Sequence, residues 1–140
     1  METWELVARE CIRDTVARYN HAGDAGRFDD MVACFAADGE LTVVGGETHH
    51  GRDALRRFFS GVGGTAPGFT HLRHCVTNLL IDVESASSAT AASYFEVITD
   101  IGLDHWGRYR DRLAPVGDRW LLVQRSVKTD GYATGSFFAA

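Results

Sequence analysis

Hydrophobic positions recur at helical spacing through the first twenty residues of the chain. Charged side chains fill the opposite face, so the segment from Trp4 to Tyr19 predicts an amphipathic helix. Turn-forming residues predict that this helix ends at about residues 20–23. A short second helix follows, and Asp38-Gly39 is expected to stop it. Its apolar side is formed by Phe28, Met31, Val32 and Phe35.

The middle of the chain predicts short elements. Residues 40–44 and 48–50 form two short strands around the turn Gly45-Gly46, and Asp53 is placed to cap a third helix. The glycines and proline of residues 61–68 then predict a loop that forms a lid or the rim of a pocket. Four longer strands follow, over residues 70–83, 88–100, 105–113 and 120–129.

This order predicts one α+β domain over residues 1–129. Short turns join the four long strands, so neighbours pair antiparallel, and the early helices pack on one face of a strongly curved sheet. Such a sheet encloses an apolar pocket at its open end. Residues 130–140 form a tail in which Phe137 and Phe138 are expected to cover the pocket mouth or a subunit contact, with a disordered tail as the alternative.

Composition narrows the class of protein. The 140 residues are 45% hydrophobic and 24% charged, which is typical of a globular domain, and the net charge of −5 disfavours a nucleic-acid partner. No segment is long and apolar enough for a membrane span or a secretory signal. The three cysteines lack the spacing of a disulfide framework, so we expect reduced thiols in a cytoplasmic protein.

The strand that begins near residue 70 carries the first candidate for chemistry. Strict alternation places Leu72, His74, Val76 and Asn78 on one face, which pairs a histidine and an asparagine with apolar neighbours. A histidine in this setting is either a hydrogen-bonded core residue or a functional group. The residues alone leave both interpretations open.

Three more polar residues stand at positions where burial is expected. Tyr19 lies on the apolar stripe of the first helix, so its hydroxyl needs a partner. Asp24 follows that helix, where aspartate is also common simply as a turn residue. Arg125 shares a strand face with apolar residues, so it either reaches an edge or is buried against an anion.

The histidine clusters do not favour a metal site. His49-His50 and His71-x-x-His74 are the two clusters, and residues three apart on a strand point to opposite faces. The sequence also contains no HExxH, GxGxxG or phosphate-loop motif. Cys75 is adjacent to His74 on the same strand, where neighbouring side chains diverge, so the two do not form a nucleophile–base pair.

Several short motifs together resemble the SnoaL-like branch of the NTF2-like superfamily. The resemblance spans about residues 6–129 and implies a cone-shaped fold. Its markers are Tyr19-x-x-x-x-Asp24, Phe35-Ala36-Ala37-Asp38-Gly39, His50-Gly51-Arg52-Asp53-Ala54-Leu55, Gly107-Arg108-Tyr109, and Trp120 with Arg125 five residues later. Among members of this superfamily, the chain is most similar to scytalone dehydratase, bile-acid 7-alpha-dehydratase and gamma-hexachlorocyclohexane dehydrochlorinase.

The resemblance implies roles for individual residues. His74 matches the histidine base of the dehydrochlorinase, Asp24 the aspartate that orients it, and Arg125 an arginine on the last strand. Tyr19 stands where the dehydrochlorinase has a lysine. A tyrosine at this place resembles the bile-acid dehydratase and implies an oxygen-bearing substrate. If the dyad forms, His74 and Asp24 should lie within about 2.6–3.2 Å.

The implied activity is that of a cofactor-independent lyase or isomerase, without a metal. It would take a proton from an apolar, oxygenated ring such as a polyketide, steroid or terpenoid. The alternatives are an aldol-type polyketide cyclase and a non-catalytic module that binds a small molecule. Family resemblance also implies a homodimer or homotrimer through the outer sheet face. Expected substrate contacts are Asn78, Tyr94, Trp106, Phe137 and Phe138.

Overall fold

Helices and strands follow the predicted order in the computed structural model, which describes residues 1–63 and 68–139. The helices are α1 (Thr3–Asp24), α2 (Phe28–Val32) and α3 (Arg52–Gly63). The strands are β1 (Phe35–Val43), β2 (Thr48–His50), β3 (Leu72–Ser85), β4 (Ser88–Thr99), β5 (Gly102–Val116) and β6 (Arg119–Tyr132). The predicted loop of residues 61–68 begins inside α3, and its residues 64–67 lie outside the described part of the chain.

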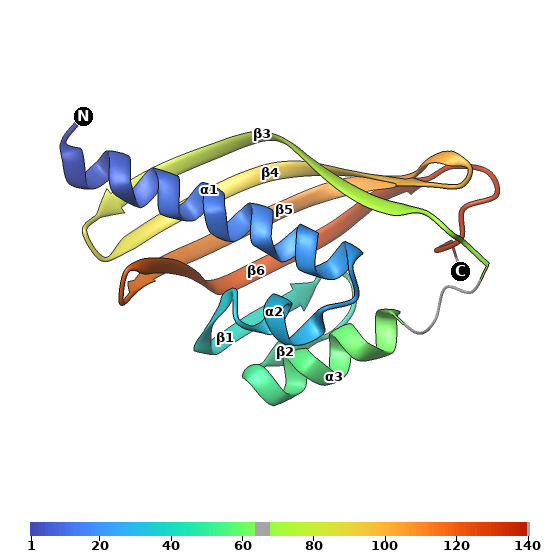
Figure 1. Cartoon of the computed structure of the whole chain (residues 1–140), viewed down its shortest axis with the longest axis horizontal. Helices are drawn as coiled ribbons and strands as arrows, with labels where there is room; N and C mark the ends of the chain where they lie inside the picture. Colours follow the sequence, from blue (N-terminus) through green and yellow to red (C-terminus); the bar gives the residue numbers. More distant parts are fainter. Residues whose placement is uncertain (64–67, 140) are drawn as a thin grey trace.

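The strands form one curved sheet in the order β2-β1-β6-β5-β4-β3 (Figure 1). The four long strands pair antiparallel through short turns, which confirms that part of the prediction. The exception to an all-antiparallel sheet is the pair of β1 and β6, which run parallel. These strands are far apart in the sequence, so no hairpin connection constrains their direction.

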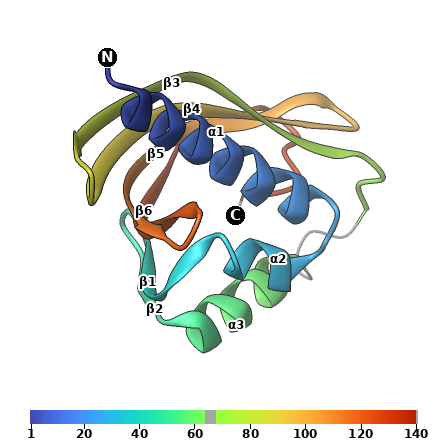
Figure 2. The same cartoon turned by 60° about the vertical axis from the view of Figure 1, so that its left-hand side comes forward.

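Helix α1 lies across the concave side of the sheet, while α2 and α3 lie with β1 and β2 on the other side of the opening (Figure 2). Two side chains fix α1 to the strands at either edge of the long-strand region. The Thr15 hydroxyl donates to the carbonyl of Trp120 on β6, and Arg9 donates to the carbonyl of Ile81 on β3 at 2.8 Å. The α1 helix is therefore held at a defined position under the sheet.

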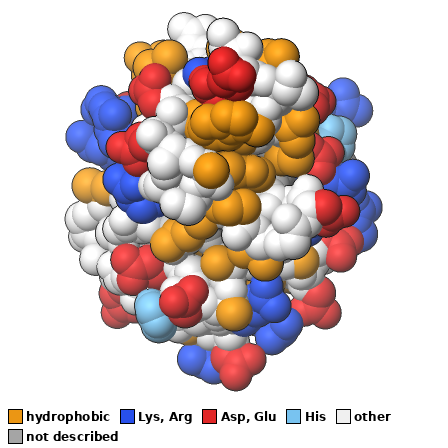
Figure 3. All heavy atoms as spheres, turned by 90° about the vertical axis from the view of Figure 1, so that its left-hand side faces the viewer, with side chains coloured by type: hydrophobic (Ala, Val, Ile, Leu, Met, Phe, Trp, Pro, Cys, Tyr) orange, Lys and Arg blue, Asp and Glu red, His pale blue; other side chains and the backbone are white. Residues whose placement is uncertain are grey.

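The first turn of α1 projects beyond the sheet. Trp4 and Val7, which the sequence pattern assigned to the buried stripe, are 45% and 57% exposed, and burial begins at Ala8. Figure 3 shows hydrophobic side chains gathered across this end of the molecule, where Val116 at the end of β5 is also exposed. The amphipathic pattern predicted the helix correctly, but the sheet is too short to cover its first turn.

Aromatic rings fill the interior between α1, α3 and the sheet. The Tyr19 ring packs edge-on against Phe35, Phe59 and Tyr109, with centroids about 6 Å apart, and Phe95 lies 4.9 Å from Tyr109. Phe35, expected on the second helix, is the first residue of β1 and is fully buried. Where the sequence predicted a deep apolar pocket, this part of the structure is packed with side chains.

Strand β6 continues to Tyr132, so the first three residues of the expected tail belong to the sheet. The segment that follows is described to Ala139 and folds back against β5, which is not the behaviour of a disordered tail. Among the described residues, no helix has the length and apolar character needed to cross a membrane.

Candidate active site

His74 and Asp24 meet where α1 ends and β3 begins. The imidazole Nδ1 lies 2.6 Å from Asp24 Oδ1, within the range expected for the dyad. The other carboxylate oxygen accepts the backbone N–H of His74 at 2.9 Å. Two contacts from one residue therefore hold this carboxylate, although 50 positions separate the partners in sequence.

The contact with Asp24 defines the chemistry available to His74. Because a carboxylate accepts at Nδ1, the neutral ring carries its proton there and presents a lone pair at Nε2. Nε2 has no hydrogen-bond partner among the described residues. The side chains of His74 and Asp24 are 25% and 19% exposed, so a small molecule can reach the pair. This arrangement suits a general base whose cationic form the carboxylate stabilises.

An open hollow of about 380 Å³ lies beside the dyad. Its lining comes from the end of α1 and the start of β3, and polar side chains form much of it. The lining residues are Asn20, His21, Asp24, Ala25, Arg27, Leu72, Arg73, His74 and Cys75. The hollow is wide enough for a small ring compound, but it is more polar and more open than the pocket predicted from the sequence.

Tyr19 and Arg125 meet each other and not the dyad. The guanidinium of Arg125 is fully buried, lies between the rings of Tyr19 and Tyr109, and forms two 2.8 Å hydrogen bonds with Asp111. Burial raises the pKa of Tyr19 to about 12, although the nearby guanidinium acts in the opposite direction. No hydrogen bond joins either residue to His74 or Asp24 within the described chain.

Three expected substrate contacts lie elsewhere. Alternation along β3 fails at a bulge between Thr77 and Leu80, where Asn78 adopts a left-handed φ of 53° and is exposed. Asparagine tolerates this conformation better than most residues. Tyr94 (52% exposed) and Trp106 (37% exposed) lie on the outer face of the sheet. The structure therefore does not bring these three side chains to the dyad.

Phe137 and Phe138 are half-buried at the end of the molecule that carries the dyad. Their rings pack against Phe69, with centroids 6.0 and 5.5 Å away, and Phe138 also contacts His105 at 4.9 Å. The segment that carries them folds back against β5, and its expected role as a pocket cover stays a prediction. A role in substrate binding stays a prediction.

A second histidine–aspartate pair escaped the sequence analysis. His105 Nδ1 lies 2.8 Å from Asp104 Oδ1, and both residues are buried. In the sheet register His74 pairs with Val97, which pairs with His105, so the two imidazoles lie on the same concave face. Burial lowers the pKa of His105, only partly offset by Asp104. The signal available in the sequence was strand alternation, which places His105 on the same face as Tyr109 and so indicates that His105 points into the interior.

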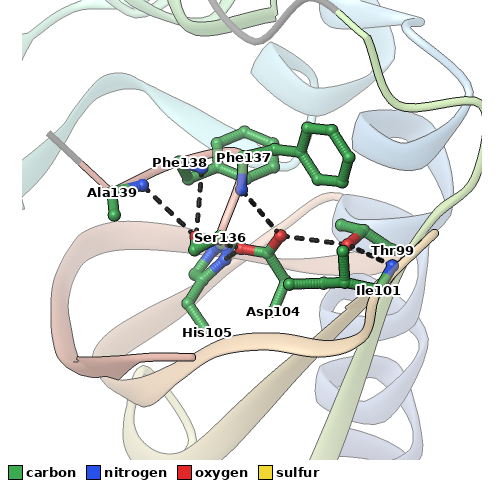
Figure 4. Close-up of polar contacts among 8 residues, drawn as sticks. All are labelled: Thr99, Ile101, Asp104, His105, Ser136, Phe137, Phe138 and Ala139. Atoms are coloured by element: carbon green, nitrogen blue, oxygen red, sulfur yellow. Dashed lines mark hydrogen bonds and ion pairs between the residues drawn. The ribbon is translucent and has the colours of Figure 1, made fainter. Parts of the chain in front are cut away.

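Asp104 is the most heavily hydrogen-bonded carboxylate in this region. Burial by itself would raise its pKa, but donors from Ser136, the Phe137 N–H, His105 and Thr99 outweigh that effect and lower the pKa to about 2. Figure 4 shows these contacts converging on the carboxylate from β4, β5 and the C-terminal segment. Asp104 is therefore ionised at neutral pH.

Among the described residues, no group of three or more His, Cys, Asp or Glu side chains is arranged to hold a metal ion. The three cysteines are free, and Cys75 is exposed on the outer face, directed away from His74 as adjacent strand residues should be.

Comparison with known proteins identifies the family and the fold. Residues 4–126 match the SnoaL-like domain. A Catenulispora acidiphila protein solved in complex with S-DNPA is 30% identical, covers 85% of this chain and 90% of its own, and superposes with a TM-score of 0.75. No curated protein matches the sequence.

Two structures from Novosphingobium aromaticivorans show the same fold. A candidate scytalone dehydratase is 23% identical, covers 95% of this chain and 91% of its own, and has a TM-score of 0.82. An NTF2-like protein with a cystatin-like fold is 24% identical, covers 96% and 91%, and has a TM-score of 0.77. The family match thus confirms the SnoaL-like part of the resemblance, and these two structures confirm the fold that the resemblance implied.

Proposed function

Because the chain belongs to the SnoaL-like domain family, we propose that it is a cofactor-independent lyase or isomerase in which His74 is the general base. The observation that carries this proposal is the 2.6 Å contact between His74 Nδ1 and Asp24 Oδ1, which leaves Nε2 free to accept a proton. A positioned histidine base typically contributes about 10²–10⁴-fold to a rate.

The proposed reaction begins with the loss of a proton from carbon. Nε2 of His74 takes the proton, and Asp24 stabilises the resulting imidazolium. In a dehydration, the C–H electron pair becomes the new double bond, the neighbouring C–O bond breaks, and the imidazolium returns its proton to the leaving oxygen to form water. In an isomerisation, the proton returns to another carbon of the same conjugated system. Neither reaction needs a redox partner.

The substrate we propose is an oxygenated ring compound of modest size. The hollow beside the dyad is about 380 Å³ and has both apolar and polar walls, so it matches a ring that carries hydroxyl or carbonyl groups. A polyketide, steroid or terpenoid fragment has this chemistry. The S-DNPA complex of the Catenulispora protein supports small-molecule binding by a relative of this fold.

A non-catalytic binding module is the second candidate. The observation that favours it is the separation of Tyr19 and Arg125 from the dyad, because an aligned acid and anion-binding group would be expected at an elimination site. A cyclase that uses the same base for an aldol step is a variant of the first candidate.

Reaction in D₂O with a panel of β-hydroxy ring ketones tests the proposal. Mass spectrometry should show loss of water, or deuterium at the carbon beside the carbonyl, with the native protein and not with His74→Gln. Binding of these compounds with neither exchange nor water loss would favour the second candidate.

A further inference from the structure

The C-terminal segment Ala133–Ala139 is attached to the sheet mainly through one residue. The backbone N–H of Ala133 donates to the carbonyl of Asp104 at 2.8 Å, and the Phe137 N–H donates to its carboxylate Oδ2 at 3.0 Å. The Ser136 hydroxyl donates to the other carboxylate oxygen. The Ser136 hydroxyl oxygen also accepts the backbone N–H groups of residues 138 and 139, so it links the segment's end to Asp104 (Figure 4).

The rings of this segment join a row of aromatic side chains. The Phe138 centroid is 4.9 Å from that of His105 and 5.5 Å from that of Phe69. The row of rings continues to the dyad, because Phe95 lies 6.3 Å from His105 and 6.4 Å from His74. A second aromatic ring cannot contact the same side of His105 while Phe138 is there.

The attachment of the segment is limited. Phe137 and Phe138 are only half-buried, and Gly135, with a left-handed φ of 84°, lies in the turn between the two anchored residues Ala133 and Ser136. Short segments with few buried apolar contacts open at much lower free energy than the global unfolding. Release of residues 133–139 breaks none of the pairing between β5 and β6, which ends at Tyr132.

We propose that the segment Ala133–Ala139 occupies a ligand subsite of its own protein, and that a hydroxylated aromatic ring displaces it. The ring of Phe138 stands in for the ligand's ring against Phe69 and His105. The Ser136 hydroxyl stands in for a ligand hydroxyl that donates to Asp104. The groups of the segment thus indicate which ligand fits the subsite: one with an aromatic face beside a hydrogen-bond donor.

The subsite extends the proposed active site, so its relevance to turnover rests on the proposed function. A multi-ring compound bound there would reach past Phe95 toward His74, with its hydroxyl fixed at Asp104. Because docked segment and ligand exclude each other, the apparent affinity equals the intrinsic affinity reduced by the fraction of molecules that are open. Weakening the anchor should therefore strengthen ligand binding.

Equilibrium binding of 2-naphthol to the full chain tests this competition. Ser136→Ala should bind 2-naphthol about tenfold more tightly than the native protein, because it loses a hydrogen bond to a carboxylate that holds the segment closed. Ser87→Ala is the matched control, since Ser87 lies in the exposed β3–β4 turn, and it should bind like the native protein. The methyl ether, 2-methoxynaphthalene, should bind Ser136→Ala about tenfold more weakly than 2-naphthol does, because it cannot donate to Asp104.

Amide NMR of the native protein provides the second readout. Saturation with 2-naphthol should move the signals of residues 137–139 to the positions of a free chain end. A chain truncated after Tyr132 should bind as tightly as Ser136→Ala, which covers the case in which that variant does not fold. The proposal is overturned if Ser136→Ala and the truncated chain, the two opened variants, bind 2-naphthol no more tightly than the native protein. It is also overturned if neither the native protein nor the opened variants show saturable binding.

A further variant separates this inference from the catalytic proposal. His74→Gln should bind 2-naphthol with native affinity, because the ring occupies the subsite at His105. If the opened variants gain affinity while His74→Gln retains full turnover of a true substrate, the subsite stands and the catalytic proposal fails.

Discussion

Buried ionisable side chains determine how single residues respond to pH in this protein. His105 is buried beside Asp104, and burial lowers its pKa although the carboxylate acts in the opposite direction. The unfolded chain therefore binds a proton at this position before the folded chain does. As pH falls below about 6.5, the ordinary pKa of histidine, this difference lowers the free energy of unfolding.

Replacement of His105 by glutamine should reduce that loss. The glutamine amide can still donate to Asp104 but does not titrate, so the variant's free energy of unfolding should fall less than the native protein's between pH 7 and pH 5. Urea unfolding at several pH values measures the difference. Identical pH profiles for the two proteins would show that His105 does not carry this linkage.

The Arg125–Asp111 ion pair illustrates why geometry matters more than charge at a buried position. Arg125→Lys cannot reproduce the two hydrogen bonds to Asp111 or the stacking on Tyr19 and Tyr109. We expect a loss of about 3 kcal/mol of stability from the broken buried pair, measured by chemical unfolding. Arg110→Lys, at an exposed position of β5, is the control and should change stability by less than about 0.5 kcal/mol. Equal losses would contradict the structural role of the pair.

At the scale of elements, the β5–β6 pairing brings Gly107 close to Phe95 on β4, whose ring lies 6.4 Å from that of His74 and 6.3 Å from that of His105. The β5–β6 register is irregular between Trp106 and Gly107. A Cβ atom added at Gly107 would clash with the carbonyl of Lys128 and come within 2.5 Å of the Phe95 ring. Only glycine fits this close approach without displacing the strand or the ring.

Gly107→Ala should therefore destabilise the protein by about 2–3 kcal/mol, the usual cost of overpacking. It should also perturb the NMR signals of His74 and His105, whose rings contact Phe95. The control is Gly46→Ala, where the added Cβ meets only ordinary contacts in the turn before β2. A Gly107→Ala variant as stable as Gly46→Ala would contradict the close packing.

Local patterns predicted the elements that depend on neighbours in sequence. Periodicity located α1 and the four long strands, and the short turns between those strands established their antiparallel pairing. The parallel pair of β1 and β6 was out of reach, because it joins segments about 80 residues apart. Similarly, the bulge at Asn78 moved that side chain outward, which alternation alone could not show.

The candidate site was predictable to the extent that family resemblance fixed it. The pairing of His74 with Asp24 came from matched motifs, and the structure places the two in contact. The resemblance implied a catalytic role for Arg125, and burial against an anion was left open, because nothing in the sequence identified Asp111 as its partner. Asp104 and His105 were missed, since the second pair is completed by Ser136 from the distant chain end.

At the scale of the whole molecule, the two ends and the outer sheet face differ in what they expose. Trp106 and Tyr94 are exposed on the outer face, and Trp4 and Val7 are exposed in the first turn of α1. Hydrophobic side chains gather at that end of the molecule (Figure 3). Following the family resemblance, we propose that copies of the chain associate through the outer face, as a dimer or trimer.

Trp106→Glu should then shift the protein to the monomer in light scattering coupled to size exclusion, because a charge would be buried in the contact. Trp4→Glu, at the α1 end, should leave the assembly unchanged. Dissociation by Trp4→Glu with no effect of Trp106→Glu would move the interface to the α1 end.

The central claim is that His74 acts as a base positioned by Asp24, and turnover of a true substrate by a double-mutant cycle tests it most directly. His74→Gln should lower kcat by about 10²–10⁴-fold, and Asp24→Asn should also lower it, because the amide cannot stabilise the imidazolium. The double mutant should be no slower than His74→Gln, since the two residues act as one unit. Native turnover by both single mutants would contradict the account.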